Sequence, residues 1–234
     1  MTAQRVRPVP FPLCPTPTDA FPVARTPSKL TTMLLQKGVP ESAIETHLTI
    51  SQGDVLNPES CADPLTLKGR PADIIISGIG IVNLSEVFSA IRLCGDAVSN
   101  ILSALHSLKL PKKPLFVALA TTGISKGPRD VPLLFVPLYH LMLANPHKDK
   151  KRMEDVVVER AEREDSAIGG YVILRPSLLT NGKARGGKYV RAGNEQKPAV
   201  GYTISRDDVG LWIFENLVQG DGQRFAGQKP SITY

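Results

Sequence analysis

The first 37 residues contain no glycine, although the chain has 19, and this limits what the N-terminal region can fold into. A phosphate-binding loop at the start of a dinucleotide-binding fold needs glycines for its tight turn and for close approach of the backbone. Prolines occur there instead, and Pro8, Pro10 and Pro12 alternate. Because alternate N–H groups of a strand point to the same edge, this segment lacks donors along one edge and is unsuited to a central strand. We therefore predict a proline-rich extended segment over residues 1–22.

The composition restricts the class of protein. With 234 residues, of which 42% are hydrophobic and 21% charged, the chain can bury a core and form one domain of ordinary size. Its 28 basic and 22 acidic residues give a net charge of +6, which favours an anionic ligand or reflects solvated surface lysines. Because no basic run contains interleaved aromatic residues, we expect a phosphorylated small molecule and no nucleic acid as partner.

Cysteine spacing and hydropathy point to a location. The three cysteines, Cys14, Cys61 and Cys94, are far apart and form no CxxC pair, so we expect no disulfide framework and a reducing compartment. No apolar run reaches the roughly 18 residues of a membrane helix, and the prolines near the N-terminus exclude a signal-peptide core. We predict a cytoplasmic protein without a membrane partner. No cluster of metal-ligand residues occurs, so we expect no metal.

Short apolar strands alternate with helical patterns from about residue 46 onward. This alternation predicts an α/β fold with a doubly wound parallel sheet, in which ligands bind beyond the C-terminal ends of the strands. Ser205 and Asp208 form a capping-box pattern that predicts the start of the last long helix. Strands are predicted at residues 48–51, 74–77, 115–120 and 171–174, and helices at 85–107 and 147–164.

Two groups of candidate binding residues follow the first strand ends. Arg25, with Ser28 and Lys29 just after it, would clamp a ribose 2′-phosphate, or would form an ordinary surface turn. Asp54 and Val55 follow the strand at 48–51. A carboxylate followed by a backbone N–H would bracket the edge of an adenine, or would cap a turn.

Further candidates follow the next two strands. Gly78 and Gly80 allow a backbone to approach a ligand closely, but Asn83 stands where a full dinucleotide fingerprint needs glycine. Thr121 and Thr122 end a strand expected to be buried on both faces. Their hydroxyls would bond a nicotinamide amide or a substrate carbonyl, or the residues would only fill space as β-branched side chains.

The last candidates lie on a charged helix and after the fourth strand. Lys150 is one of several charged residues near the start of the helix at 147–164, where it would bind ribose hydroxyls or form part of a solvated face. Pro176 and Ser177 follow the strand at 171–174. The sequence contains no Ser–His–Asp signature, no GxSxG and no HExxH.

Six sequence blocks in this order resemble the atypical short-chain dehydrogenase/reductase superfamily. The resemblance is to its NAD(P)H-binding branch, which includes biliverdin reductase B (flavin reductase) and NmrA-like proteins. No single block is specific, and the six together extend from residue 23 to about residue 218. The blocks are residues 24–30, 50–55, 75–80, 118–124, 171–177 and 202–210.

The resemblance implies a Rossmann-like domain over residues 23–234 that prefers NADP. It implies an NADPH-dependent oxidoreductase acting on a small carbonyl, quinone or flavin-like acceptor. The alternatives are a non-catalytic NAD(P)-binding sensor or scaffold and a truncated inactive product. It also assigns roles: Arg25, Ser28 and Lys29 to the 2′-phosphate, Asp54 and Val55 to adenine, Gly78 and Gly80 to pyrophosphate and ribose, Thr121, Thr122, Pro176 and Ser177 to the nicotinamide side, and Thr121 and Lys150 to catalysis.

The sequence departs from the family pattern at two places. Pro146 stands where the lysine's usual tyrosine partner would be, and Tyr139 is the nearest tyrosine in sequence. The family's first strand, GxxGxxG turn and helix, a unit of roughly 30 residues, have no counterpart here. Because that strand is central in the sheet, its loss would unpair two neighbours and uncover core. We therefore expect either a truncated or misassembled product or a degenerate relative with weak cofactor binding.

Overall fold

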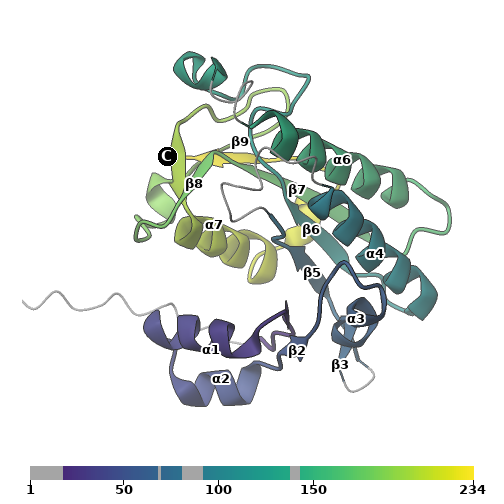
Figure 1. Cartoon of the computed structure of the whole chain (residues 1–234). Coiled ribbons are helices and arrows are strands. Elements are labelled where there is room, and N and C mark those ends of the chain that lie inside the picture. The colour runs from purple at the N-terminus through teal and green to yellow at the C-terminus, as the bar shows by residue number, and fades with distance from the viewer. Residues whose placement is uncertain (1–17, 68–69, 81–91, 138–142) are drawn as a thin grey trace, which may run out of the picture.

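Five strands form the main sheet, in the order β5–β6–β7–β11–β9 (Figure 1). The computed structural model describes residues 18–67, 70–80, 92–137 and 143–234. All neighbours in this sheet pair in parallel except β9, which is antiparallel to β11. Smaller two-stranded sheets pair β1 with β2, β3 with β4 and β8 with β10. The strands are β1 (Val23–Ala24), β2 (Ser51–Gln52), β3 (Thr66–Leu67), β4 (Arg70–Pro71), β5 (Ile74–Ser77), β6 (Leu115–Leu119), β7 (Gly170–Pro176), β8 (Leu178–Thr180), β9 (Arg191–Gly193), β10 (Thr203–Ser205) and β11 (Ser231–Thr233).

Helices cover both faces of the main sheet, with α4 and α6 on one side and α7 on the other (Figure 1). In the part of the chain that the structure describes, no helix combines the length and apolar character needed to cross a membrane. The helices are α1 (Pro27–Gln36), α2 (Glu41–His47), α3 (Glu59–Ala62), α4 (Leu93–Leu108), α6 (Ala144–Ala161) and α7 (Arg206–Ile213), with short helical turns η1 (Asp63–Leu65), η3 (Leu133–Phe135), η4 (Gly187–Tyr189), η5 (Phe214–Val218) and η6 (Gly222–Phe225).

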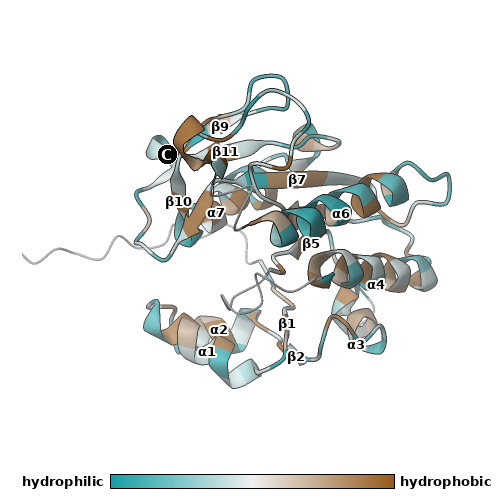
Figure 2. Ribbon diagram, turned by 45° about the horizontal axis from the view of Figure 1, so that its top comes forward, coloured by the Kyte–Doolittle hydropathy of each residue, from teal (hydrophilic) through white to brown (hydrophobic). Residues whose placement is uncertain are grey.

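The strand β6 divides the core into two clusters. Phe116 and Ala118 pack with α4 and α6, whereas Leu115 and Val117 pack with α7, and all four side chains are buried. Successive side chains of a strand point to opposite faces, so a strand with helices on both sides must be apolar throughout. The polar face of α6 points away from the sheet (Figure 2). The predicted doubly wound parallel sheet, with a strand buried on both faces, is confirmed.

Most predicted elements are present, with shifted ends. The strand at 74–77 is β5 as predicted, and the helix at 147–164 begins three residues earlier as α6. The helix at 85–107 is α4 from Leu93 onward, while its first part lies outside the described residues, as do residues 1–17 of the proline-rich segment. The strand predicted at 48–51 is shorter, because Leu48 makes only a single bridge to Ala20 and the ladder begins at Ser51.

The parallel sheet is interrupted between β1 and β5. Within the described residues, β1 pairs only with β2 and β5 pairs only with β6. Figure 1 places β2 on the side of β5 that faces away from β6, and Figure 2 places β1 and β2 on the side of β5 that faces away from β7. Ile76 of β5 is 46% exposed, and neither α1 nor α2 contains a buried residue. The expected loss of two pairings and uncovering of core are therefore both observed.

Within the described residues, side chains on two sides attach the β1–β2 pair and its flanking helices α1 and α2 to the rest of the molecule. The Asn100 side-chain amide on α4 donates hydrogen bonds to the carbonyls of Val55 and Leu56, each at 3.1 Å. At the other side, Lys37 at the end of α1 forms an ion pair with Asp207 of α7. These contacts hold β1 and β2 beside β5, and no strand among the described residues pairs with both β1 and β5.

A buried carboxylate closes the C-terminal half of the fold. Asp208, in the first turn of α7, accepts hydrogen bonds from the backbone N–H groups of Arg185 (2.8 Å) and Gly186 (2.9 Å) and from the hydroxyls of Ser205 (2.9 Å) and Tyr234. Ser205 also caps α7 as predicted, because its Oγ accepts from the Asp208 N–H at 3.0 Å. Burial alone would raise the pKa of Asp208, but these donors outweigh it and hold that pKa below its usual value.

This network predicts a dependence of stability on pH. Because the pKa of Asp208 is depressed in the folded state, its stabilisation is fully present above the unfolded-state value of 3.8 and is lost as the pH falls through the lower folded value. We expect Asp208→Asn to lower Tm at pH 7. The difference in Tm between the variant and the unsubstituted protein should become smaller below about pH 4. Thermal melts followed by circular dichroism from pH 7 to pH 2 measure this difference. Asp73→Asn, at an exposed carboxylate, is the matched control. A difference in Tm that stays constant from pH 7 to pH 2 would contradict the depressed pKa of Asp208.

Candidate active site

The C-terminal ends of β5, β6 and β7 bring together one group of the predicted residues. Ser77 pairs in register with Ala118, and the Thr122 N–H donates to the Pro176 carbonyl at 3.1 Å. The segments that follow these strands therefore lie along one edge of the sheet, where an α/β fold binds its ligand. The candidates at this edge are Gly78, Gly80, Thr121, Thr122, Lys150, Pro176 and Ser177.

Lys150 connects the ends of two adjacent strands. Its Nζ donates hydrogen bonds of 2.6 Å to the carbonyls of Ile79 and Leu119, which follow β5 and end β6. A Cβ added to Gly80 would lie 3.9 Å from this Nζ. Lys150 therefore lies against the strand ends and not on a solvated helix face, and its ammonium places a positive charge at the site edge.

A buried ion pair positions the helix that contains Lys150. One turn after Lys150, the Glu154 carboxylate receives two hydrogen bonds from Arg175 of β7, from Nε at 2.8 Å and from Nη2 at 2.7 Å. The side chains of Arg175 and Glu154 are only 5% and 1% exposed. A bidentate pair of this kind fixes both distance and orientation, so α6 is held in register with β7. Glu154 thus pairs across to the sheet and not with Lys150.

The start of α6 is also attached to α4. The Asp149 carboxylate accepts from the backbone N–H groups of Cys94 (2.7 Å) and Gly95 (3.0 Å), where unpaired donors at the start of α4 attract an anion. Burial raises the pKa of the Cys94 thiol to about 11, despite the opposing charge of Lys150. The raised pKa favours the thiol form of Cys94 over the thiolate at neutral pH.

Buried hydroxyls at the strand ends lack partners. Within the described residues, Ser77 Oγ, Thr122 Oγ1 and Asp130 Oδ2 are buried and make no hydrogen bond. Buried polar groups are normally satisfied, so such atoms indicate a water or ligand that completes them. Next to Ser77, a Cβ added to Gly78 would meet nothing within 4 Å, so the space above this turn is open. The turn after β5 therefore combines an open backbone position at Gly78 with a buried hydroxyl at Ser77.

A turn after β6 positions Thr121 and Thr122. Gly123 has a positive φ of 85°, which favours glycine, and its N–H donates to Asp130 Oδ1 at 3.0 Å. Burial raises the pKa of Asp130, while the Gly123 N–H and the charge of Arg175 oppose that increase. The turn is therefore closed by a carboxyl group next to the Glu154–Arg175 pair.

Ser177 is used inside the fold. Its Oγ shares a 2.8 Å hydrogen bond with Thr233 Oγ1, and its N–H donates to the Ile232 carbonyl at 3.0 Å. These bonds attach the end of β7 to β11. The border that Pro176 and Ser177 would form beside a nicotinamide stays a prediction, and it depends on their backbone more than on the Ser177 hydroxyl.

The second group of candidates follows β1 and β2. Arg25 is exposed directly after β1, and Ser28 and Lys29 are exposed in the first turn of α1. Asp54 Oδ1 accepts from the Leu56 N–H at 2.9 Å, so Asp54 caps the turn after β2, the alternative considered from the sequence. Val55 packs against the core beside α4. The parallel pairing of β1 and β2 places these residues at one edge, and the break in the sheet separates them from the group around Lys150.

The position that the resemblance assigns to the usual tyrosine is occupied by Pro146, which has no hydroxyl. Pro146 lies in the first turn of α6, where the missing N–H costs no helical hydrogen bond. Tyr139 lies outside the described residues.

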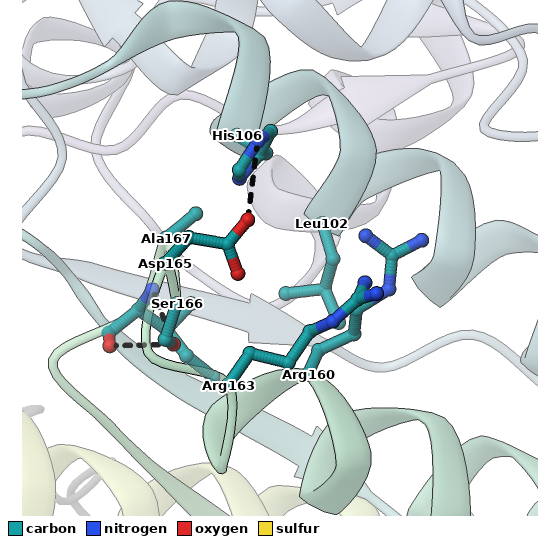
Figure 3. A pocket seen from close by; sticks show the side chains of 8 residues that line it. Leu102, His106, Arg160, Arg163, Asp165, Ser166 and Ala167 are labelled. Atoms are coloured by element: carbon teal, nitrogen blue, oxygen red, sulfur yellow. Dashed lines mark hydrogen bonds and ion pairs between the residues drawn. The ribbon is translucent and has the colours of Figure 1, made fainter.

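A surface hollow is also present, at the opposite end of the sheet (Figure 3). It lies between the end of α4 and the segment that precedes β7, and His106 and Asp165 face each other across it with Nε2 and Oδ2 3.7 Å apart. In a parallel sheet this is the end away from the ligand site, so the hollow is not part of it.

Sequence reasoning missed Glu154–Arg175, Ser77 and Asp130. Glu154 and Arg175 are 21 residues apart, and nothing in the sequence shows that they form a pair. A signal existed for Ser77, because a hydroxyl ends an otherwise apolar strand just before Gly78.

The fold and this edge define a dinucleotide-binding α/β protein. The model of the NAD(P)H-binding family matches residues 23–219, and the chain belongs to this family. It is 47% identical to Reductase pytE of Aspergillus terreus over 230 residues, which cover 91% of this chain and 87% of that protein. It is 33% identical to Oxidase pynE of Aspergillus niger over 252 residues, with 92% and 89% covered. Family membership and these relatives support an oxidoreductase.

Solved structures agree on the fold. A short-chain dehydrogenase/reductase (wide type) of Veillonella parvula in complex with NADP superimposes with a TM-score of 0.63 at 17% identity, covering 92% of this chain and 94% of that one. ChuY, an anaerobilin reductase of Escherichia coli O157:H7, gives a TM-score of 0.57 at 16% identity, with 92% and 96% covered. The Rossmann-like architecture is therefore shared with these proteins.

Proposed function

We propose that the protein is an NADPH-dependent oxidoreductase of the atypical short-chain type, which reduces a small carbonyl, quinone or flavin-like acceptor. One observation supports this most directly: the Lys150 ammonium joins the ends of β5 and β6 beside Gly80. The carbonyl that it binds on β6 belongs to Leu119, two residues before Thr121. A fixed positive charge at the strand ends stabilises negative charge that develops on an acceptor oxygen.

The residues at both strand edges fit NADPH. Arg25 and Lys29 offer exposed cations for a 2′-phosphate, and the open backbone at Gly78 leaves room for the ribose and pyrophosphate. Thr121 and Thr122 lie where hydroxyls would bond the carboxamide. When bound, the cofactor supplies a hydride to the acceptor. The protein contributes orientation and charge, and solvent or the Thr121 hydroxyl delivers the proton in place of the missing tyrosine.

The replacement of the usual tyrosine by Pro146 favours a second candidate, a non-catalytic NAD(P)-binding sensor or scaffold of the NmrA-like kind. Calorimetric titration with NADPH, followed by turnover assays with quinone and flavin acceptors, separates the candidates. An oxidoreductase binds and turns over, a sensor only binds, and an inactive product does neither. If micromolar NADPH neither binds nor raises Tm, the proposed function is wrong.

Replacement of Arg25 tests the preference for NADPH. We expect Arg25→Ala to raise the Kd of NADPH about tenfold, because a guanidinium–phosphate contact is lost, and to leave NADH within about twofold. Titration calorimetry with both cofactors measures the two constants. Arg163→Ala removes an equally exposed arginine away from the site and serves as the control. Equal losses for NADPH and NADH would exclude a 2′-phosphate contact at Arg25.

A further inference from the structure

Exposed apolar side chains gather beside the end of β7. Leu133 and Leu134 in η3 are 72% and 77% exposed. The neighbouring Phe135 packs edge-on against Tyr202, with ring centroids 5.0 Å apart, and Thr203 pairs in register with Leu178 of β8. Leu178 and Tyr202 are also exposed. We call the set Leu133, Leu134, Phe135, Leu178 and Tyr202 the apolar rim.

The rim is joined to the candidate site along the chain at two places. Leu178 follows Ser177 directly, and Leu133 follows Asp130 by three residues, which span at most about 11 Å. Asp130 itself accepts from the Gly123 N–H at 3.0 Å, next to Thr122. From the site edge the chain therefore leads directly into β8 after Ser177 and, within three residues of Asp130, into η3.

The exposed leucines of the rim have buried neighbours in the sequence. Val131, just before η3, is buried, and Leu179 of β8 packs into the core while Leu178 faces outward. Two adjacent leucines that remain exposed beside buried neighbours form an apolar surface of the kind that marks a ligand or interaction site.

We propose that the apolar rim binds the hydrocarbon chain of the acceptor, so that the substrate is a reducible carbonyl or quinone with a long apolar substituent. This inference rests on the proposed function, because it assigns the outer part of the same substrate. The reducible group lies at Thr121 and Lys150, and the chain lies along Leu178, Tyr202 and the two leucines. Each methylene that the rim buries raises affinity roughly fourfold.

The test compares methyl-1,4-benzoquinone with decyl-1,4-benzoquinone, both by KM at saturating NADPH and by calorimetric binding. In the unsubstituted protein we expect KM and Kd to be at least about tenfold lower for the decyl compound. In Leu133→Ser/Leu134→Ser this difference falls below about threefold, while KM for the methyl compound and Kd for NADPH stay within about twofold. Leu35→Ser, which replaces a leucine that is 43% exposed on α1, is the control, and we expect it to leave KM and Kd unchanged for both quinones.

An unchanged decyl-to-methyl ratio in the double variant overturns the inference. So does a dimer in sedimentation velocity that the double variant dissociates, since the rim would then join two copies. If neither quinone is reduced but the affinity for decyl-1,4-benzoquinone still depends on the two leucines, the proposed function is wrong and the inference that the rim binds a hydrocarbon chain is kept. The binding measurement therefore distinguishes the two failures.

Discussion

Replacing Arg175 by methionine is expected to lower the free energy of unfolding by about 3–5 kcal/mol. The substitution leaves the Glu154 carboxylate, whose side chain is 1% exposed, without the guanidinium that donates its two hydrogen bonds. A buried charge that loses its partner keeps its desolvation cost and gains nothing in return. For a chain of this length the loss corresponds to a decrease in Tm of roughly 6–20 °C. Thermal melts at pH 7 measure it.

Two further variants separate the buried ion pair from a general effect of removing a cation. Lys112→Met removes the cation of the exposed pair Lys112–Asp73, and we expect a change in Tm of less than about 2 °C. Arg175→Met/Glu154→Leu removes both buried charges and should recover most of the lost stability. If Arg175→Met and Lys112→Met shift Tm equally, the pair does not hold α6 to β7.

The main sheet was predictable because its signal is local. Apolar runs at 74–77 and 115–120 and the cap at Ser205 depend on neighbouring residues, and the structure has them where the sequence indicated. The break between β1 and β5, which is observed within the described residues, was also predictable, because the alternating prolines near the N-terminus are unsuited to a central strand. The short ladder at Ser51 was not predictable, because nothing in the apolar pattern at 48–51 shows that Leu48 makes only a single bridge.

The site was predictable only in part, because its electrostatics depend on distant residues. Strand ends located Gly78 and Thr121, since all parallel strands end at one edge, whereas Lys150 was indicated by the charged helix and the family resemblance. The carbonyls that Lys150 binds come from Ile79 and Leu119, 71 and 31 residues away, and no spacing rule pairs them. The contact of Asp54 could be predicted from the sequence, because its hydrogen bond from the Leu56 N–H is local. A capped turn was the alternative to adenine binding considered for this residue.

The Lys150 ammonium is the one charged group shown to reach the ends of both β5 and β6, within the described part of the site edge. Lys150→Met removes its charge and leaves the Ile79 and Leu119 carbonyls without their donor. Preorganised charge of this kind typically contributes 100- to 1,000-fold to a rate, so we expect kcat/KM with NADPH and a quinone to fall by roughly that factor. The loss should be mainly in kcat, because Lys150 is expected to act on charge that develops during the reaction more than on cofactor binding.

The adjacent lysine on the same helix gives a matched control for this loss. Lys151 pairs with Asp155 on the partly exposed face of α6, so Lys151→Met removes the same charge from the same turn without touching the strand ends. It should keep kcat/KM within about threefold, well short of a factor expected from lost preorganised charge. Stopped-flow and steady-state assays, with Tm as a check on folding, compare the two variants. A Lys150→Met protein that folds and keeps its kcat would show that the ammonium only joins the two strand ends, and the reaction would then depend on Thr121 and the cofactor alone.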